Sequence, residues 1–273
     1  MMSKRRTCLV GFALASLTTS AFANDDVPPV SDAPAGEYAA MRGVQGPAGM
    51  FSARLLVDIN LSDGKVGKPI SIAPDLYYSV TDKLQLGLTH TGPMGWQARP
   101  GVGLCVTGTD NGCANVYDNL GADVMYGVLF GEAYLSLHGS LFFNSFDRSS
   151  TSVALGVTGR AHFGDKVALL FDPKIAIEVD DRDVSDDVVY VPLELAFQVA
   201  PKTQIKLLAG ILGGITHFSD TYEVPVGIGI VQNLTKHFDL GARFSFDNLL
   251  GNQPANVGAA DTRSVAVLLN IRS

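Results

Sequence analysis

The sequence predicts an all-β fold, a single transmembrane antiparallel up-and-down β-barrel of about 12 strands with short periplasmic turns and longer extracellular loops. Three observations indicate this fold. Apolar and polar residues alternate over long segments, the connections between these segments alternate in length, and the chain begins with an export signal. Together they favour a barrel that contacts lipid over a soluble β domain.

The alternation is clear in residues 153–178, VALGVTGRAHFGDKVALLFDPKIAIE, where apolar residues occupy one parity and polar residues the other. This period of two is typical of a strand with one apolar and one polar face. Strands of soluble proteins have about 5–6 residues, whereas a tilted strand that crosses a bilayer needs about 9–11. Most of the alternating segments have 11 to 13 residues, which favours a membrane barrel. They are 50–61, 68–79, 83–91, 119–129, 132–143, 151–163, 167–179, 188–199, 203–214, 221–232, 237–247 and 262–272.

The connections between the segments sort by parity. Every second connection is a turn of two to four residues, such as Thr81-Asp82 or Gly164-Asp165-Lys166, and the others are longer, up to the stretch 92–118. Outer-membrane barrels have short periplasmic turns and long external loops. The turn at 164–166 pairs Phe163 with Val167 and predicts an ion pair between Arg160 and Asp172 on the polar face.

The N-terminus has the features of a secretory signal peptide, predicted as residues 1–23. Basic residues (Lys4, Arg5 and Arg6) precede a short apolar stretch, and Ala21-Phe22-Ala23 provides a cleavage site before Asn24. Residues 24–49 are rich in Pro, Ala and Gly without periodicity, and we expect a flexible periplasmic leader. The outer-membrane barrel is then predicted to occupy 50–273.

Composition excludes several classes of partner and site. The formal charge is −7, and removal of the three basic residues of the signal peptide makes it more negative, so no nucleic-acid partner is predicted. No run of 18 apolar residues follows residue 23, so no transmembrane helix is predicted. Cys105 and Cys113 lie in one loop of an exported chain, where a disulfide is expected and free thiols are the alternative. That loop has no His to complete a metal site, and no metal or cofactor is predicted.

The polar face is predicted to surround the barrel axis. A lipid-facing Arg or Lys at mid-membrane costs about 2–4 kcal/mol, and a twelve-stranded barrel has an interior too wide to fill with aliphatic side chains alone. Prolines at 74, 173, 192 and 225 fall within predicted strands, and we expect β-bulges there because each proline removes a ladder donor. The alternatives are that the prolines shift the strand boundaries or that two predicted strands merge. The predicted lumen-lining residues are Arg54, Asp58, Asp75, Asp123, His138, Arg160, Asp172, Lys174, Glu194, Lys206, Glu223, Asp239 and Arg243.

By this architecture, residues 50–273 resemble the outer-membrane β-barrel proteins of Gram-negative bacteria, porin-like in size. The resemblance implies a cell outer membrane location, contact with its lipids and lipopolysaccharide, and insertion by the barrel assembly machinery. It departs from these families at the last strand, SVAVLLNIRS, which lacks their usual terminal Phe or Trp.

Three functional hypotheses remain open at this point. The first is a passive porin-like channel for small polar solutes, with a mild cation preference because acidic residues outnumber basic ones in the predicted lumen. The second is a non-conducting structural or surface-binding barrel that is plugged by the leader or by loop 92–118. The third, a lipid-active enzyme built on His138-Gly139-Ser140, is disfavoured because both side chains are expected to face away from lipid. No catalytic residue is predicted, and the acidic stretch DDRDVSDD (180–187) is interpreted as a solvated loop rather than a cation site.

Overall fold

The computed structural model describes Arg42 and residues 44–91, 101–131, 133–145, 150–180, 182, 186–253 and 257–273. The predicted signal peptide (1–23) and most of the predicted leader lie outside the described residues. Within the described part of the chain, no helix is long and apolar enough to cross a membrane.

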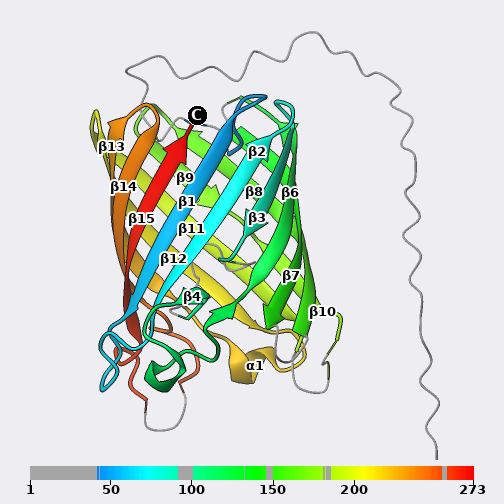
Figure 1. Ribbon diagram of the computed structural model, residues 1–273. Coiled ribbons are helices and arrows are strands. Elements are labelled where there is room, and N and C mark those ends of the chain that lie inside the picture. The colour runs from blue at the N-terminus through cyan, green and yellow to red at the C-terminus, as the bar shows by residue number, and fades with distance from the viewer. Residues whose placement is uncertain are drawn as a thin grey trace, which may run out of the picture.

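The chain forms a closed antiparallel barrel of twelve strands, shown in Figure 1. The barrel closes because β1 pairs on one side with β2 and on the other with β15. Two consecutive short strands, β9 and β10, together fill one place in the wall between β8 and β11. The barrel strands are β1 (Phe51–Asn60), β2 (Ile70–Ser79), β3 (Leu84–Thr89), β6 (Leu120–Leu129), β7 (Ala133–Ser145), β8 (Ser150–Phe163), β9 (Val167–Phe171), β10 (Lys174–Glu178), β11 (Val188–Ala200), β12 (Thr203–Gly214), β13 (Val226–Thr235), β14 (Phe238–Phe246) and β15 (Arg263–Arg272).

The predicted fold class is confirmed, including the strand number and the sorting of connections by length. The short turns gather at the end of the barrel that holds the C-terminus, and the long loops gather at the opposite end (Figure 1). The predicted register at the turn 164–166 is also confirmed, because Phe163 pairs with Val167. We refer to the two ends as the short-turn end and the long-loop end.

The expected β-bulges are absent at Pro74 and Pro192, whereas the alternative, a shifted strand boundary, is found at Pro225. The ladder runs without a register shift through Pro74 of β2 and Pro192 of β11, while the shifts lie elsewhere, for example between Gly127 and Leu129. Pro74 lies beyond the β2–β3 pairing, which covers Leu76–Ser79, so β3 requires no donor from it. Pro173 instead separates β9 from β10, and Pro192 accepts a hydrogen bond from the Asp172 amide there (3.3 Å). The prolines are therefore accommodated where the ladder already lacks a partner.

The predicted strand 221–232 begins later than expected. A helical turn, α1 (Phe218–Thr221), precedes it, and β13 starts only at Val226, directly after Pro225. Glu223 lies before the strand and forms an isolated bridge with Leu212 of β12. Pro225 thus coincides with the start of a strand, one of the positions where a missing amide is tolerated.

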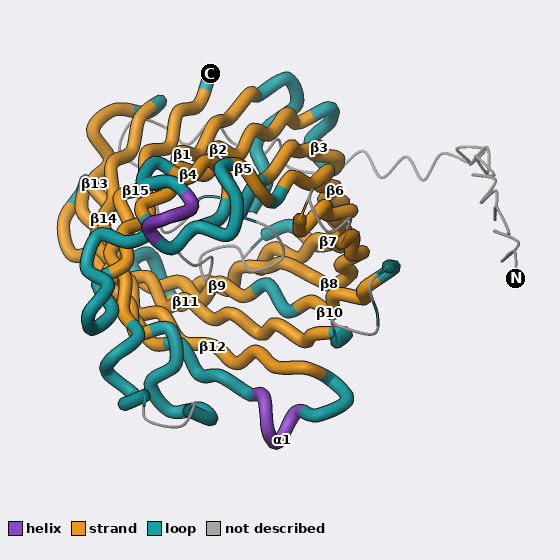
Figure 2. Tube along the Cα trace, turned by 60° about the horizontal axis from the view of Figure 1, so that its bottom comes forward, coloured by secondary structure: helices purple, strands orange, loops and turns teal. Residues whose placement is uncertain are grey.

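The long connection 92–118 contains structure that the sequence did not predict. The two short strands β4 (Gly103–Cys105) and β5 (Tyr117–Asp118) form a hairpin that pairs with β2 beyond the end of β3, toward the long-loop end (Figures 1 and 2). A 3₁₀ turn at Thr109–Asn111 lies between them, and the Cys105–Cys113 disulfide is present as predicted. This hairpin extends the wall where β3 is too short to do so.

Several inward-facing glycines make room for rings rather than for an open lumen. A Cβ on Gly121 of β6 would lie 2.2 Å from the Phe142 ring, and a Cβ on Gly87 of β3 would lie 2.6 Å from the Tyr77 ring. Phe142 itself is only 1% exposed. Part of the interior is therefore packed against aromatic side chains from neighbouring strands.

Candidate functional site

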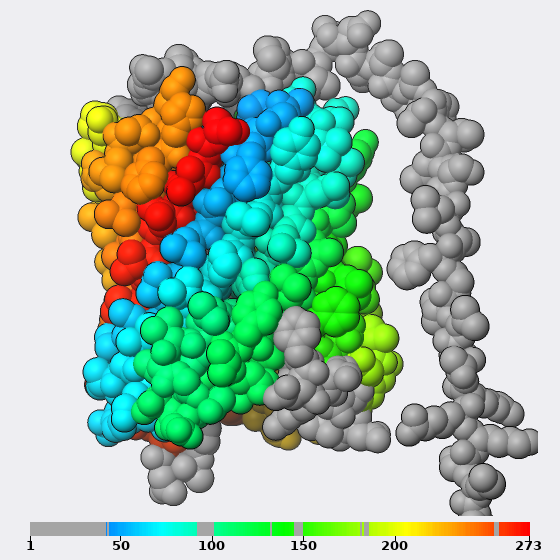
Figure 3. Space-filling model, viewed as in Figure 1, coloured from blue at the N-terminus to red at the C-terminus, as the bar shows by residue number. Residues whose placement is uncertain are grey.

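The two faces of the barrel wall have opposite polarity. On the inner face, Asp58 and Asp75 are at most 1% exposed, whereas on the outer face Leu137 and Leu155 are more than half exposed. This distribution is the reverse of that in a soluble protein, where Asp is almost never fully buried. Figure 3 shows the outer face over β15, β1 and β2, a continuous wall without a break between these strands. An apolar exterior around polar interior side chains is the arrangement of a barrel in lipid.

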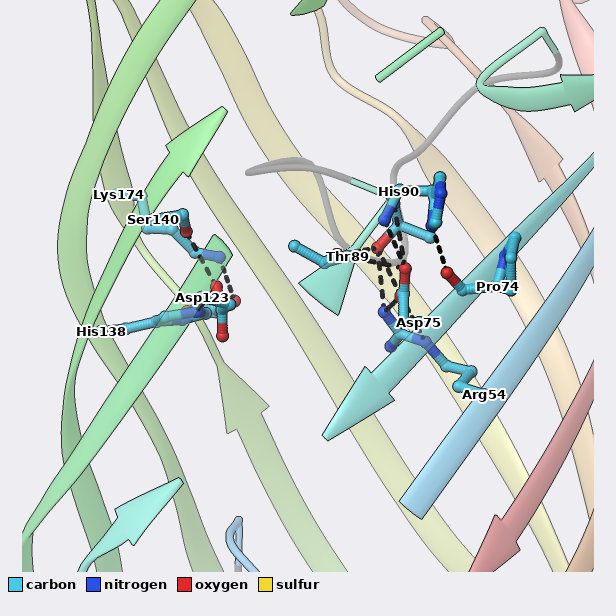
Figure 4. A network of polar contacts seen from close by, with 11 residues as sticks. Arg54, Pro74, Asp75, Thr89, His90, Asp123, His138, Ser140 and Lys174 are labelled. Carbon is cyan, nitrogen blue, oxygen red and sulfur yellow. Dashed lines mark hydrogen bonds and ion pairs between the residues drawn. The ribbon is translucent and has the colours of Figure 1, made fainter. Parts of the chain in front are cut away.

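A first cluster of charges is centred on His138 of β7 (Figure 4). Its Nε2 lies 2.7 Å from an oxygen of Asp123 on β6, and its Nδ1 lies 2.8 Å from an oxygen of Asp172 at the β9–β10 junction. Lys174 Nζ contacts the second oxygen of Asp172 at 2.8 Å. Both ring nitrogens of His138 therefore face carboxylate oxygens, and Lys174 joins the same network.

This geometry argues against the Ser–His pair that the sequence raised as an alternative. The Ser140 hydroxyl donates to Asp123 at 2.8 Å, and both nitrogens of His138 face carboxylates. A general base needs a free ring nitrogen within reach of the nucleophile's proton. His138 offers neither of its nitrogens to Ser140. The arrangement is that of a charge network in the wall.

A second cluster is centred on Asp75 of β2, which is fully buried. Its carboxylate accepts from the His90 amide (2.7 Å) and from the Thr89 and Thr91 hydroxyls (3.1 and 2.9 Å), and it forms an ion pair with Arg54 of β1. The sequence pointed to Arg54 and Asp75 but missed these three residues, although all of them lie in the predicted segment 83–91. Thr89 has the inward parity of β3, which was a signal for it, whereas His90 and Thr91 follow the end of the strand, where the alternation no longer applies.

Further ion pairs join the predicted residues along the wall. Arg243 of β14 lies 2.9 Å from Asp58 of β1, and Lys206 of β12 lies 2.7 Å from Glu194 of β11. Asp239 of β14 is shared by Arg272 (2.5 Å) and Arg42 (3.4 Å), two cations outside the predicted set. Arg272 has the inward parity of β15, so the alternation contained a signal for it that the predicted set left out. Arg42 belongs to the predicted leader, where there is no alternation to mark it.

The predicted ion pair between Arg160 and Asp172 is replaced by other contacts. Asp172 is held by His138 and Lys174, while Arg160 donates from Nη1 to the backbone oxygen of Arg42. Both side chains are on the polar face, as their parity requires. The choice of partner depends on which strands meet across the interior.

The long-loop end contains two features. One is part of the acidic stretch 180–187, and the other is an open hollow of about 440 Å³. Asp187 forms an ion pair with Arg182 (2.8 Å), and Asp180 accepts from the Thr151 amide (2.5 Å), so these carboxylates serve the loop's own structure. Among the residues that the structure describes, no group of acidic, His or Cys side chains has the arrangement of a metal site. The hollow is lined by Asn60, Ser62, Lys65, Lys68, Pro69, Asp110, Asn111, Gly112 and Asp247.

Comparison with known protein families and with curated protein sequences finds no match. Comparison with solved structures finds many similar folds. The NanC porin matches with a TM-score of 0.57 and 7% identity, over 80% of this chain and 98% of that one. The KdgM porin, solved in complex with disordered oligogalacturonate, matches with a TM-score of 0.53 and 9% identity, over 81% and 98% of the two chains. An outer-membrane channel from Pseudomonas putida F1 matches with a TM-score of 0.54 and 16% identity, over 84% and 97%.

These likenesses agree with the geometry of the wall. Only helices and closed barrels satisfy every backbone polar group within lipid, and this barrel is closed, apolar outside and charged inside. In outer-membrane barrels the short turns are the periplasmic ones. The chain has the fold of these porins, a closed twelve-stranded β-barrel with an apolar exterior and a charged interior.

Proposed function

We propose that the protein is a passive channel for small polar solutes. The observation that carries the proposal is the ring of charged side chains on the inner face, from Asp58 and Arg243 to the cluster around His138. A buried charge is costly unless it is paired or hydrated, so a charged inner face is compatible with an interior that holds water. Rings of charged side chains are also the means by which pores select ions.

In this proposal the partly exposed members of the predicted set, such as Arg54 and Asp172, border the solute path, and none of the set is catalytic. Asp58 and Asp75 lie behind them, buried in ion pairs of the wall. Acidic groups outnumber basic ones in that set, which favours cations mildly. We also propose that the outer face contacts outer-membrane lipids and lipopolysaccharide and that the barrel assembly machinery inserts the chain, as the resemblance implies.

A second candidate is a barrel that does not conduct because its own chain fills it. One observation favours it: the last residues of the leader contact the inside of the barrel, where Arg42 reaches Asp239. The two candidates differ in a measurable property. The intact protein conducts in the first and is silent in the second.

The test is conductance in a planar bilayer, with two cysteine variants that differ only in the face they occupy. Asn270 lies on the inner face of β15, and its neighbour Leu269 lies on the outer face. Cys105 and Cys113 are joined in a disulfide and Cys8 belongs to the predicted signal peptide, so an added thiol is the reactive one. We expect stepwise currents from the intact protein. A bulky charged thiol reagent should lower the step size of Asn270→Cys and leave Leu269→Cys unchanged.

Two results would overturn the channel. A folded, purified barrel that gives no current steps would leave the second candidate as the function. Current that persists unchanged after complete modification of Asn270→Cys would show that ions do not pass through the bore.

A further inference from the structure

The residues just before β1 extend across the short-turn end of the barrel. We call Arg42 and residues 44–49 the strap. Its C-terminal part follows the rim, where the Gly49 amide donates to the Ser79 oxygen (2.7 Å) and the Ala48 amide donates to Asp82 Oδ1 (2.8 Å). The Gly46 amide then reaches Gln85 Oε1 on β3 (3.4 Å), and Gly46 is buried. The strap therefore turns inward from the rim.

Gln45 contacts a different part of the wall. Its side-chain nitrogen Nε2 donates to the backbone oxygen of Lys83 (3.3 Å), and its side-chain oxygen Oε1 accepts from the Ser136 hydroxyl on β7 (3.3 Å). A Cβ on Gly127 of β6 would lie 2.8 Å from the same Gln45 oxygen. The wall thus has a glycine where the strap passes closest to β6.

Arg42 reaches the other side of the bore. Its guanidinium lies 3.4 Å from Asp239 of β14, and its backbone oxygen accepts from Arg160 of β8. Going round the barrel, β9/β10, β11, β12 and β13 separate β8 from β14 on one side, and six strands separate them on the other. The strap thus contacts β8 and β14 through Arg42 and β7 through Gln45. Contacts with strands so far apart require the strap to cross the interior.

The strap also changes the local balance of charge. Asp239 is shared between Arg42 and Arg272, so one carboxylate faces two guanidinium groups. Two guanidinium groups therefore meet one carboxylate at this point of the inner face, although acidic groups outnumber basic ones in the set predicted from the sequence.

We propose that the strap narrows the solute path at the short-turn end and that Arg42 is a selectivity-determining residue there, one that disfavours cations. This inference rests on the channel function proposed above. The inference assigns to the predicted leader a role that the barrel strands alone do not have. The charge of Arg42 lies on the strap, which can be altered without disturbing the β ladder.

The first test measures ion selectivity from the reversal potential in a KCl gradient. A unit charge about 8 Å from a passing ion in water changes the permeability ratio of K⁺ to Cl⁻ on the order of fivefold, because it acts on the two ions in opposite senses. We expect Arg42→Gln to raise this ratio by about that factor. Arg42→Lys should keep the wild-type ratio. Arg182→Gln, in an exposed loop at the other end, is the matched control.

The second test locates the strap without using conductance. In the folded barrel, Gln45→Cys and Ser136→Cys should be joined by a short bifunctional thiol reagent and identified by mass spectrometry. Gln45→Cys with Ser152→Cys, near the long-loop end of β8, should not be joined. Deletion of residues 24–48, with the signal peptide kept, should increase the conductance about twofold or more, because the bore then loses its narrowest part.

The outcomes separate this inference from the channel proposal. If Arg42→Gln conducts with an unchanged permeability ratio of K⁺ to Cl⁻, the inference is overturned and the channel stays in place. The same holds if no cross-link forms between positions 45 and 136. Current that appears only after deletion of 24–48 would support the position of the strap and make the intact protein a plugged barrel. Silence in both the intact and the shortened protein would overturn the channel.

Discussion

Arg243 of β14 and Asp58 of β1 form an ion pair at 2.9 Å across the intervening strand β15, and both side chains are at most 5% exposed. The pair joins two strands that share no ladder, close to the seam where the first and last strands of the chain meet. It therefore ties together the N-terminal and C-terminal parts of the barrel.

Removal of one partner of this pair is expected to be costly. Asp58→Ala leaves the Arg243 guanidinium buried without its carboxylate, and a broken buried pair costs about 3–5 kcal/mol. Unfolding by guanidinium chloride in lipid vesicles measures this loss. Arg182→Ala, which breaks an exposed pair in a loop, is the control, with an expected cost below about 1 kcal/mol. Equal midpoints for the two variants would contradict a structural role of the Asp58–Arg243 pair.

The outer face gives a second prediction. Leu155 of β8 is 58% exposed and faces outward, so Leu155→Arg places a cation in lipid and should cost about 2–4 kcal/mol. Leu250→Arg, at a residue that is 69% exposed in a long connection, should be neutral. The same unfolding measurement in vesicles compares them. A neutral Leu155→Arg would indicate that this face does not meet hydrocarbon.

The packing of Gly121 against Phe142 gives a third prediction. A Cβ at residue 121 would lie 2.2 Å from a ring that has almost no exposed surface, so Gly121→Ala should cost about 1–3 kcal/mol by overpacking. Gly139→Ala on the neighbouring strand β7 is the matched control, because its nearest neighbour would be at 3.5 Å, an ordinary contact. Thermal unfolding of both variants in detergent measures the difference. If both variants melt with the wild type, the interior near Phe142 is not tightly packed.

The disulfide gives a fourth prediction, on the hairpin that completes the wall. Reduction of Cys105–Cys113 opens a short loop, a change that typically costs about 2–3 kcal/mol. We expect faster hydrogen exchange at the Cys105 and Val106 amides, which donate to Val116 and Ile70. The ladder amides of β14 serve as the internal control, with unchanged exchange. Uniform acceleration throughout the barrel would show that the disulfide holds the whole fold rather than the hairpin.

Local pattern was sufficient to determine most of the barrel strands and their two faces. A period of two is a property of neighbouring residues, so the alternation around Leu155 and the turn at Gly164 could be read without knowing which strands pair. The outward direction of Leu155 and the inward direction of Asp58 followed from the cost of placing charge in lipid. The prediction of a disulfide between Cys105 and Cys113 also needed only their proximity in an exported chain.

Tertiary structure alone decided which inner side chains meet. Asp172 binds His138 and Lys174 rather than Arg160 because pairing across the bore depends on the closure and register of the whole sheet, which no short segment encodes. The prolines needed no bulges because the ladder ends beside them, a fact about neighbouring strands. The place of Arg42 in the bore depends on contacts with strands that are distant in sequence, where periodicity carries no information.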